Sequence, residues 1–212
     1  MEFVNKKITI PISSKKFEGV MTIPSKSKAI IVFVHGGGGA VKSPRNNAIA
    51  RVLNKNNFGT LLFELLTDKE DLSNKNNLNI DLLSTRLLAA TKWLIKQPMA
   101  QGLKIGYFSV SSGTAAAIRA SSKLRKIFAI VSKSGRPDLS MSYLSIVKAP
   151  ILFIVGEDDE VITTLNEQAF INLSGEKSMV IIPNAGHFFD EPGTSKEVAK
   201  FTLNWFKKYS RK

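Results

Sequence analysis

The sequence predicts an α/β fold, in which a mostly parallel central sheet of about eight strands is flanked by helices on both faces. Short β-branched or aromatic runs alternate along the chain with longer segments of helical period, which is the order of strand–helix–strand units. Four runs are almost continuously apolar, as central strands buried on both faces are: AIIVFV, KIGYF, IFAIVS and ILFIVG. No internal repeat or low-complexity linker divides the chain, so we expect one domain over residues 1–212.

Eight segments are predicted to be strands. They cover residues 6–12, 17–23, 28–34, 58–64, 103–108, 127–132, 150–155 and 178–182. The first two lie too close together for a crossover helix, so we expect an antiparallel hairpin at the edge of the sheet. Later strands are mostly separated by helix-length segments, which is typical of parallel neighbours.

Two helices are recognised by their ends. Ser43 is the expected N-cap of the first, and Pro44 stands at its first position, where a missing N–H is harmless. The second covers residues 80–97, with apolar residues at steps of three and four, and Pro98 ends it.

Two further helix starts are predicted from capping-box spacing, in which a threonine precedes a glutamate by three residues. The pairs are Thr164 with Glu167 and Thr194 with Glu197. The polar segment 68–79 is expected to be the only long loop of the first half of the chain.

The composition narrows the class of protein. The chain has no cysteine, which excludes disulfides, thiolate metal sites and a cysteine nucleophile. The N-terminal segment lacks the apolar core and cleavage site of a secretory signal, and the longest apolar run is too short to cross a bilayer, so we expect a soluble cytoplasmic protein without membrane contact. The formal charge of +13 comes from scattered lysines, which favours a solvated surface over a specific nucleic-acid site; a polyanion-binding protein is the weaker alternative.

The segment GYFSVSSGT, residues 106–114, joins a predicted strand to a predicted helix and contains three serines. In a nucleophile elbow the reactive residue has a strained backbone, so the residues two before and two after it must be small. Ser111 meets this condition, with Ser109 and Gly113 at those positions. Each of the other serines would have a bulky or β-branched residue at one of them. Ser111 is therefore the predicted nucleophile, and a plain serine-rich turn is the alternative.

A serine nucleophile needs a histidine base that is oriented by a carboxylate. The chain has two histidines; His35 is expected to pack at the base of a loop, whereas His187 follows the last predicted strand, at the same sheet edge as the elbow. Asp159 is the predicted acid, because it lies at the tip of the loop in ILFIVGEDDEVI, and Asp158 and then Asp138 are the alternatives. The order serine, acid, histidine is that of such hydrolases.

Four adjacent acids make up this loop, at residues 157–160. They could form a cation site, but no second cluster of carboxylates or histidines accompanies them. We therefore expect no metal and no other cofactor.

Two backbone N–H groups are expected to stabilise the oxyanion of an acyl transfer. Ser112 follows the nucleophile at a helix N-terminus, and Gly37 lies in HGGGG after the third strand. Gly36, Gly38 and Gly39 leave that loop free of side chains, so that a substrate can approach the backbone. A phosphate loop is the alternative, but no Gly-Lys-Ser/Thr follows.

Taken together, these stretches resemble the α/β-hydrolases, in particular the dienelactone hydrolase-like group. The resemblance covers nearly the whole chain and is carried by HGGGG, SPRNNAIARVLN, TLLFELLT, LLSTRLLAATKWL, GYFSVSSGTAAAI, SKSGRPDL, ILFIVGEDDEVI and PNAGHFFDEPG. It implies an α/β-hydrolase fold and a serine triad of Ser111, Asp159 and His187, which acts on an ester-like substrate through an acyl-enzyme. Dienelactone hydrolases proper use a cysteine nucleophile, and Ser109 replaces the first glycine of the usual G-x-S-x-G elbow. The chain is also similar to domains found beside phosphoribosyltransferase domains.

The predicted site is open. Fewer than twenty residues lie between the strands that flank 133–150, which leaves no room for a large lid domain and favours small soluble esters or lactones. Glu64 is expected near the same edge as a possible substrate contact, and a surface carboxylate at a strand end is the alternative. Arg45, Arg136 and Lys133 could pair with an anionic group of the substrate. Acyl transfer to an acceptor other than water, or a non-catalytic binding or regulatory module, would use the same scaffold. The sequence leaves the oligomeric state open, a homodimer included.

Overall fold

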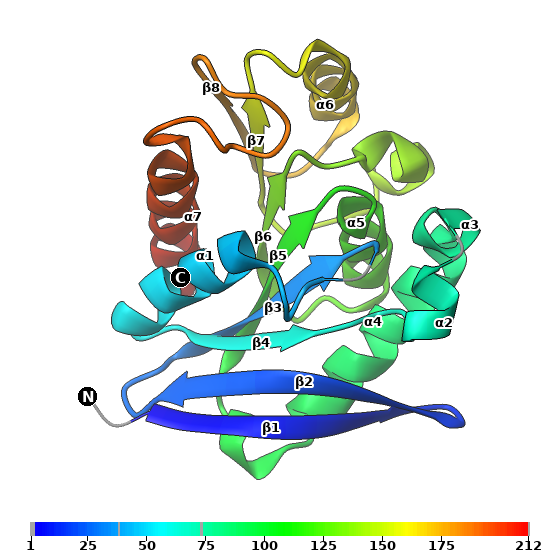
Figure 1. Cartoon of the computed structure of the whole chain (residues 1–212), viewed down its shortest axis with the longest axis vertical. Coiled ribbons are helices and arrows are strands. Elements are labelled where there is room, and N and C mark those ends of the chain that lie inside the picture. Colours follow the sequence, from blue (N-terminus) through cyan, green and yellow to red (C-terminus); the bar gives the residue numbers. More distant parts are fainter. Residues whose placement is uncertain (1–2, 38, 73, 212) are drawn as a thin grey trace.

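An eight-stranded sheet runs through the centre of the molecule, as seen in the computed structural model, which describes residues 3–37, 39–72 and 74–211 (Figure 1). The strand order is β1-β2-β4-β3-β5-β6-β7-β8. The strands are β1 (Phe3–Ile12), β2 (Lys15–Pro24), β3 (Ala29–His35), β4 (Gly59–Phe63), β5 (Lys104–Val110), β6 (Ile127–Lys133), β7 (Ile151–Gly156) and β8 (Lys177–Ile182). All eight predicted strands are confirmed; the largest difference is that β1 begins at Phe3 rather than at residue 6.

The hairpin at the sheet edge is confirmed as well. β1 pairs antiparallel with β2, in a register that runs from Phe3 opposite Pro24 to Ile12 opposite Lys15. β2 is also antiparallel to β4, whereas the neighbouring pairs from β4 to β8 are parallel. The carboxyl ends of the parallel strands therefore meet at one edge, where the loops carrying polar residues come together.

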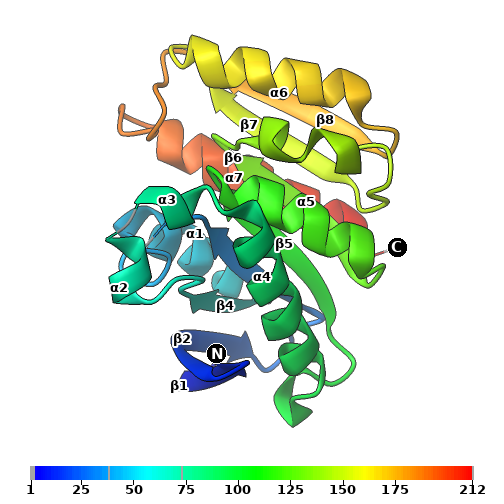
Figure 2. The ribbon, with the colours of Figure 1, turned by 90° about the vertical axis from the view of Figure 1, so that its right-hand side faces the viewer.

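Helices cover both faces of the sheet. α1 (Pro44–Lys55) and α7 (Thr194–Ser210) lie on one face; α4 (Ile80–Ile95), α5 (Gly113–Lys123) and α6 (Glu160–Asn172) lie on the other (Figures 1 and 2). The shorter helices are α2 (Asp68–Asp71), α3 (Asn74–Asn77) and the 3-10 helices η1 (Pro98–Ala100) and η2 (Pro137–Tyr143). Within the described ranges, no helix is both long enough and apolar enough to cross a membrane.

The two halves of the core explain the continuous apolar runs. In β3, Ile30 and Val32 pack toward α4 and α5, while Ile31 and Phe33 pack toward α1 and α7. All four are 0–1% exposed. Because burial of one such side chain contributes roughly 1.5–3 kcal/mol, the central strands are held firmly on both faces, and the loops at their ends start from fixed positions.

Two predicted helix starts differ from the structure. α6 begins at Glu160 with Asp159 at its N-cap, so Thr164 lies inside the helix and forms no capping box. α7 has Gly193 at its N-cap, with φ at 89°, and Thr194 is its first helical residue. Each helix begins earlier than predicted, because the loop before it ends at an earlier N-cap residue. The Ser43 cap of α1 is confirmed, since its side chain accepts the Asn46 N–H at 3.2 Å.

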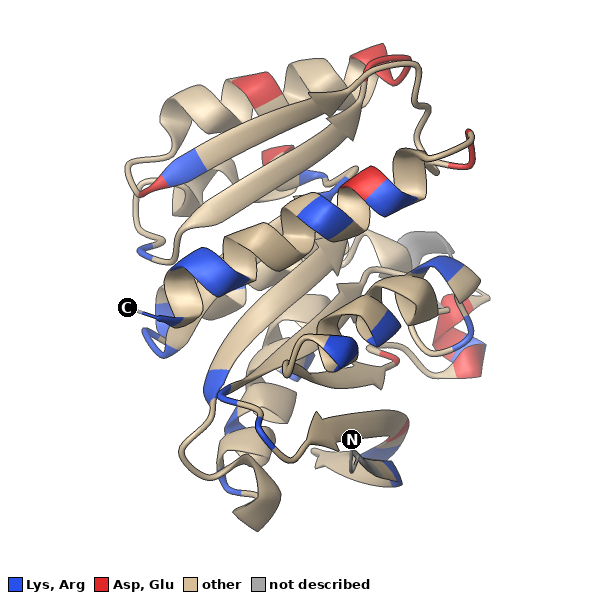
Figure 3. Cartoon of the chain, turned by 90° about the vertical axis from the view of Figure 1, so that its left-hand side faces the viewer, with Lys and Arg blue, Asp and Glu red and all other residues tan. Residues whose placement is uncertain are grey.

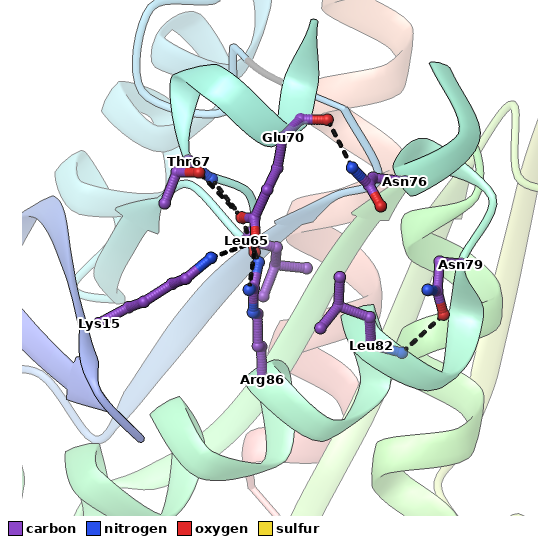
Figure 4. Close-up of polar contacts among 8 residues, drawn as sticks. All are labelled: Lys15, Leu65, Thr67, Glu70, Asn76, Asn79, Leu82 and Arg86. Atoms are coloured by element: carbon purple, nitrogen blue, oxygen red, sulfur yellow. Dashed lines mark hydrogen bonds and ion pairs between the residues drawn. The ribbon is translucent and has the colours of Figure 1, made fainter. Parts of the chain in front are cut away.

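Segment 68–79 is not the long loop that its polarity predicts, because α2 and α3 form within it. The Glu70 carboxylate bonds this segment to neighbouring elements of the fold (Figure 4). It accepts the Thr67 N–H at 2.9 Å and two bonds from the Arg86 guanidinium at 2.8 Å each, and it pairs with Lys15 of β2. The hydrogen bond from Arg86 holds the pKa of Glu70 well below its usual range. This network fastens the segment to α4 and to the hairpin.

Candidate active site

Ser111, Asp159 and His187 all lie in loops at the carboxyl edge of the sheet. Ser111 follows β5, Asp159 follows β7 and His187 follows β8. The strand order places β5, β6, β7 and β8 side by side, so three segments far apart in the sequence reach the same edge.

Ser111 has the strained backbone of an elbow residue, with φ at +52°. Its N–H donates to the Lys133 carbonyl at 3.4 Å. Its own carbonyl accepts the Thr114 and Arg136 N–H groups, each at 3.0 Å. These hydrogen bonds to α5 and to the end of β6 stabilise the positive φ of Ser111, which is unfavourable for a serine in an unconstrained loop.

The neighbours of Ser111 fit the tight turn in different ways. A Cβ on Gly113 would lie 2.5 Å from the Val34 carbonyl oxygen, so only glycine fits there. Ser109 is fully buried, and its hydroxyl donates to the Val131 carbonyl at 2.9 Å and lies 3.0 Å from Thr114 Oγ1. The extra side chain at this position is therefore accommodated in a buried polar cluster.

The structure brings His187 and Asp159 together. His187 Nδ1 lies 2.6 Å from Asp159 Oδ2, and the Asp159 side chain is only 15% exposed. A carboxylate at Nδ1 keeps a proton on that atom, which leaves Nε2 as the atom that can accept one. The alternative acids lie elsewhere: Asp158 is exposed, and Asp138 accepts two bonds from Arg136 at 2.8 Å each.

Backbone contacts hold the two loops of this pair together. The Asp158 N–H donates to the Ala185 carbonyl at 2.9 Å, and a Cβ on Gly156 would lie 2.2 Å from that same oxygen. On the other side, the Ser134 hydroxyl donates to the His187 carbonyl at 2.8 Å. The position of the imidazole is thus fixed by β6, β7 and β8 together.

The acidic run 157–160 forms no metal-binding group. Across residues 3–37, 39–72 and 74–211, no three His, Cys, Asp or Glu side chains converge on one point where they could hold a metal ion. Glu157 accepts the Asn184 N–H at 2.9 Å and Asp159 bonds to His187, so these two carboxylates bind the loop that carries the histidine.

The expected oxyanion donors differ in how they are placed. Ser112 is the N-cap residue of α5, and within the described residues its N–H has no acceptor. The Gly37 N–H lies 3.2 Å from His35 Nδ1, and the Gly37 carbonyl lies 2.8 Å from the same nitrogen. Gly38 falls outside the described residues.

Gly36 and Asn77 pack around Ser112. The Ser112 hydroxyl donates to the Asn77 carbonyl at 2.6 Å, and a Cβ on Gly36 would lie 1.7 Å from the Ser112 Oγ. Asn77 therefore helps to position the start of α5, a contact that sequence reasoning missed because the two residues are 35 positions apart in the chain.

Glu64 binds the end of the glycine loop HGGGG (residues 35–39) and the two residues that follow it. Its carboxylate accepts the N–H groups of Gly39, Ala40 and Val41 at 3.0, 3.1 and 2.9 Å. Both oxygens are used by the loop, so the structure gives Glu64 a loop-positioning contact where the sequence predicts a substrate contact.

The predicted substrate-binding arginines have carboxylate partners. Arg45 makes two bonds to Asp190, at 2.7 and 2.5 Å. Arg136 makes two to Asp138, and this hydrogen bonding raises the pKa of Arg136. Lys133, at the end of β6, is different: it is only 6% exposed, and burial lowers its pKa to about 8.

The chain matches one family model and is similar to two named proteins. A family model described as the dienelactone hydrolase family matches residues 17–210. Two proteins of Mycobacterium tuberculosis, from strains CDC 1551 / Oshkosh and ATCC 25618 / H37Rv, are 43% identical over 189 residues, and each is named a "Putative phosphoribosyl transferase". The match covers 89% of this chain but only 43% of either relative, so the chain spans less than half their length.

Solved structures share the fold. A dienelactone hydrolase from Anabaena variabilis ATCC 29413 is 40% identical, with a TM-score of 0.94 over 99% of both chains. Est1E from Butyrivibrio proteoclasticus has a TM-score of 0.78 over 95% of this chain and 99% of its own; at 14% identity, that likeness concerns the fold alone.

Proposed function

Since the chain belongs to the dienelactone hydrolase family, we propose that it hydrolyses small esters or lactones through a serine acyl-enzyme. The family and its esterase neighbours support hydrolase activity. The observation that carries the finer proposal is the strained Ser111, φ +52°, at the same sheet edge as the bonded His187 and Asp159.

The proposed reaction uses three side chains. Ser111 Oγ attacks the substrate carbonyl and forms the acyl bond, while His187 Nε2 takes the hydroxyl proton. The alcohol leaves with that proton as the C–O bond of the substrate breaks. Water then attacks the acyl-serine, His187 takes and returns a proton again, and the carboxylic acid departs. Asp159 keeps the imidazole oriented and stabilises its charged form.

The oxyanion is assigned to the N-terminus of α5. The Ser112 N–H has no acceptor within the described residues and follows the nucleophile directly, so it is the first donor in this proposal. Gly37 is the second donor once its N–H turns from His35 Nδ1 toward the substrate. One such donor typically lowers the barrier by about 3 kcal/mol.

A groove beside the glycine loop is the proposed place for the rest of the substrate. It has a volume of about 710 Å³ and is lined by Gly39, Val41 and Leu66, with Phe17 from β2. Ser111, Asp159 and His187 do not line it, so it would hold only a part of the substrate that is remote from the reacting carbonyl. That volume suits a small molecule. Charged residues of both signs also line it, among them Lys42 and Asp68, so we infer a small, uncharged polar ester or lactone.

The test is steady-state hydrolysis of p-nitrophenyl acetate, p-nitrophenyl butyrate and dihydrocoumarin. Ser111→Ala and His187→Ala should each lower kcat by at least about 10⁴-fold, because these groups act as one unit. Ser122→Ala, on α5 but away from the elbow, should retain normal rates. Unchanged rates in Ser111→Ala would overturn the assignment.

Two alternatives stand on the same scaffold. Acyl transfer to another acceptor would use the same three residues, and product analysis with competing alcohols and amines separates it from hydrolysis. A non-catalytic binding or regulatory module would leave the folded wild type without turnover on any ester. Phosphoribosyl transfer, named for relatives that extend well beyond the matched region, is not assigned to this site.

A further inference from the structure

A second pocket, of about 360 Å³, lies between α1 and α7. It opens on the face of the sheet that these two helices cover. Ile49 and Val52 of α1 form one apolar wall, Val198 and Leu203 of α7 form the other, and Phe188 borders it from the histidine loop. The pocket contains none of the three proposed catalytic side chains.

The charged residues of this pocket are all basic. Arg45, Lys133, Lys196 and Lys200 line it, and no acidic residue does. Figure 3 shows lysine and arginine along α1 and α7 on this side of the molecule. An apolar cleft surrounded by positive charge favours a ligand with an apolar body and an anionic head.

Lys133 is the one of these four cations that is buried. It is 6% exposed, and its Nζ lies 4.6 Å from the centre of the Phe189 ring. In the part of the chain that the structure describes, no hydrogen bond or ion pair joins this Nζ to another residue, and the Nζ is not among the side-chain atoms that are fully closed off from water. The ammonium is therefore largely desolvated but still accessible from the pocket, and a carboxylate there would give it the acceptor that the protein does not.

The other cations of the pocket are already satisfied or solvated. Arg45 is paired with Asp190 through two bonds. Lys200 is 61% exposed and pairs with Glu197 one turn away. An incoming anion therefore gains most at Lys133.

We propose that the pocket between α1 and α7 binds a small amphipathic monocarboxylate, whose carboxylate accepts hydrogen bonds from Lys133 Nζ and whose alkyl or aryl part packs between the helices. A volume of about 360 Å³ is near the lower end for ligand sites, which limits the apolar part to a few carbons. Binding here does not involve Ser111, so a failure to bind a carboxylate would not contradict the proposed ester hydrolysis, and a failure to hydrolyse esters would not contradict this site.

The charge state of Lys133 gives the site a pH dependence. Burial lowers its pKa to about 8, the nearby charge of Arg45 on α1 acts in the same direction, and Asp190 before α7 and Asp159 after β7 oppose it. A carboxylate binds the protonated form, so its affinity should fall about tenfold from pH 7 to pH 9.

The test is calorimetric titration of the full chain carrying Ser111→Ala with sodium hexanoate and with neutral hexanamide, at fixed ionic strength. Hexanoate should bind at least about tenfold more tightly than hexanamide, and Lys133→Met should remove that preference. Lys200→Met, which removes an exposed charge from the same pocket, should change the affinity for hexanoate less than about threefold.

A second variant locates the ligand independently of Lys133. Ala48 is exposed and lines the mouth, so Ala48→Phe should fill the pocket without disturbing the core, and binding of hexanoate should be lost. Equal affinities for hexanoate and hexanamide, no effect of Lys133→Met in a folded protein, or unchanged binding in Ala48→Phe would each overturn the proposal.

Discussion

His187 Nδ1 lies 2.6 Å from Asp159 Oδ2, although 28 positions separate the two residues in the chain. The contact is built by the backbone, because the Asp158 N–H donates to the Ala185 carbonyl and only glycine fits at position 156 beside that oxygen. The imidazole is therefore held by a carboxylate whose own loop cannot move away independently.

Replacing the carboxylate by its amide should separate orientation from charge. In Asp159→Asn the amide can present its N–H₂ to Nδ1 and favour the wrong tautomer, so kcat should fall by about 10³- to 10⁴-fold while the fold persists. Asp158→Asn, at the exposed neighbour, should keep kcat within about twofold. Ester hydrolysis and circular dichroism of both variants check this; equal losses in the two would contradict the choice of acid.

The elbow should not tolerate a side chain at position 113. In Gly113→Ala the new Cβ would lie 2.5 Å from a backbone oxygen of β3, which cannot yield as a flexible side chain can. The free energy of unfolding should fall by about 3 kcal/mol or more, and hydrolysis should be lost. Gly175→Ala is the matched control, since its nearest contact is an ordinary 3.4 Å, and chemical denaturation should place it within about 1 kcal/mol of the wild type.

Glu64 should affect turnover through the glycine loop and not through direct contact with the ester. Glu64→Gln turns an N–H₂ group toward backbone N–H donors that now bond to the carboxylate, so the loop should shift. We expect kcat to fall about 10- to 100-fold with little change in KM. Glu167→Gln, which alters an exposed carboxylate of α6 outside the groove, should leave kcat unchanged. A change confined to KM would indicate substrate contact instead.

The Glu70 network should give the protein an acid-sensitive contribution to stability. The folded-state pKa of Glu70 lies below its ordinary value of 4.5, so the stabilisation is present above pH 4.5 and is lost as the pH falls below it. At pH 7, Glu70→Gln should cost about 2 kcal/mol because it weakens the bonds to Arg86. Urea unfolding at pH 7 and near pH 3 checks this: the difference from the wild type should shrink at the lower pH. Glu167→Gln, at an exposed carboxylate of α6, should show no such change.

The strands could be predicted from the sequence because burial on both faces leaves a local signature. Ile30 to Phe33 alternate between the two core halves, so every position is apolar. The positive φ of Ser111 could be predicted for a similar reason, since the need for small residues around it is a local steric condition. The closeness of His187 and Asp159 could be predicted from their chain order and from the shared edge of a parallel sheet, while their catalytic roles stay predictions.

The partners of charged residues could not be predicted, because they come from elements far apart in the chain. Arg45 meets Asp190 across 145 positions, and α2 depends on Arg86, sixteen positions after Glu70. The sequence predicts Lys133 as a possible partner of an anionic substrate group, but not its burial against Phe189, which comes from a loop more than fifty positions later. The predicted capping boxes at Thr164 and Thr194 are not formed, because each helix begins earlier, after another N-cap residue.

Labelling with a fluorophosphonate probe tests the central claim most directly, because the probe reacts with an activated serine whatever the natural substrate is. Peptide mass spectrometry of the labelled wild type should place the adduct on Ser111, and labelling should disappear in Ser111→Ala and in His187→Ala. Absence of labelling on the folded wild type, or an adduct on Ser109 or Ser112, would contradict the account.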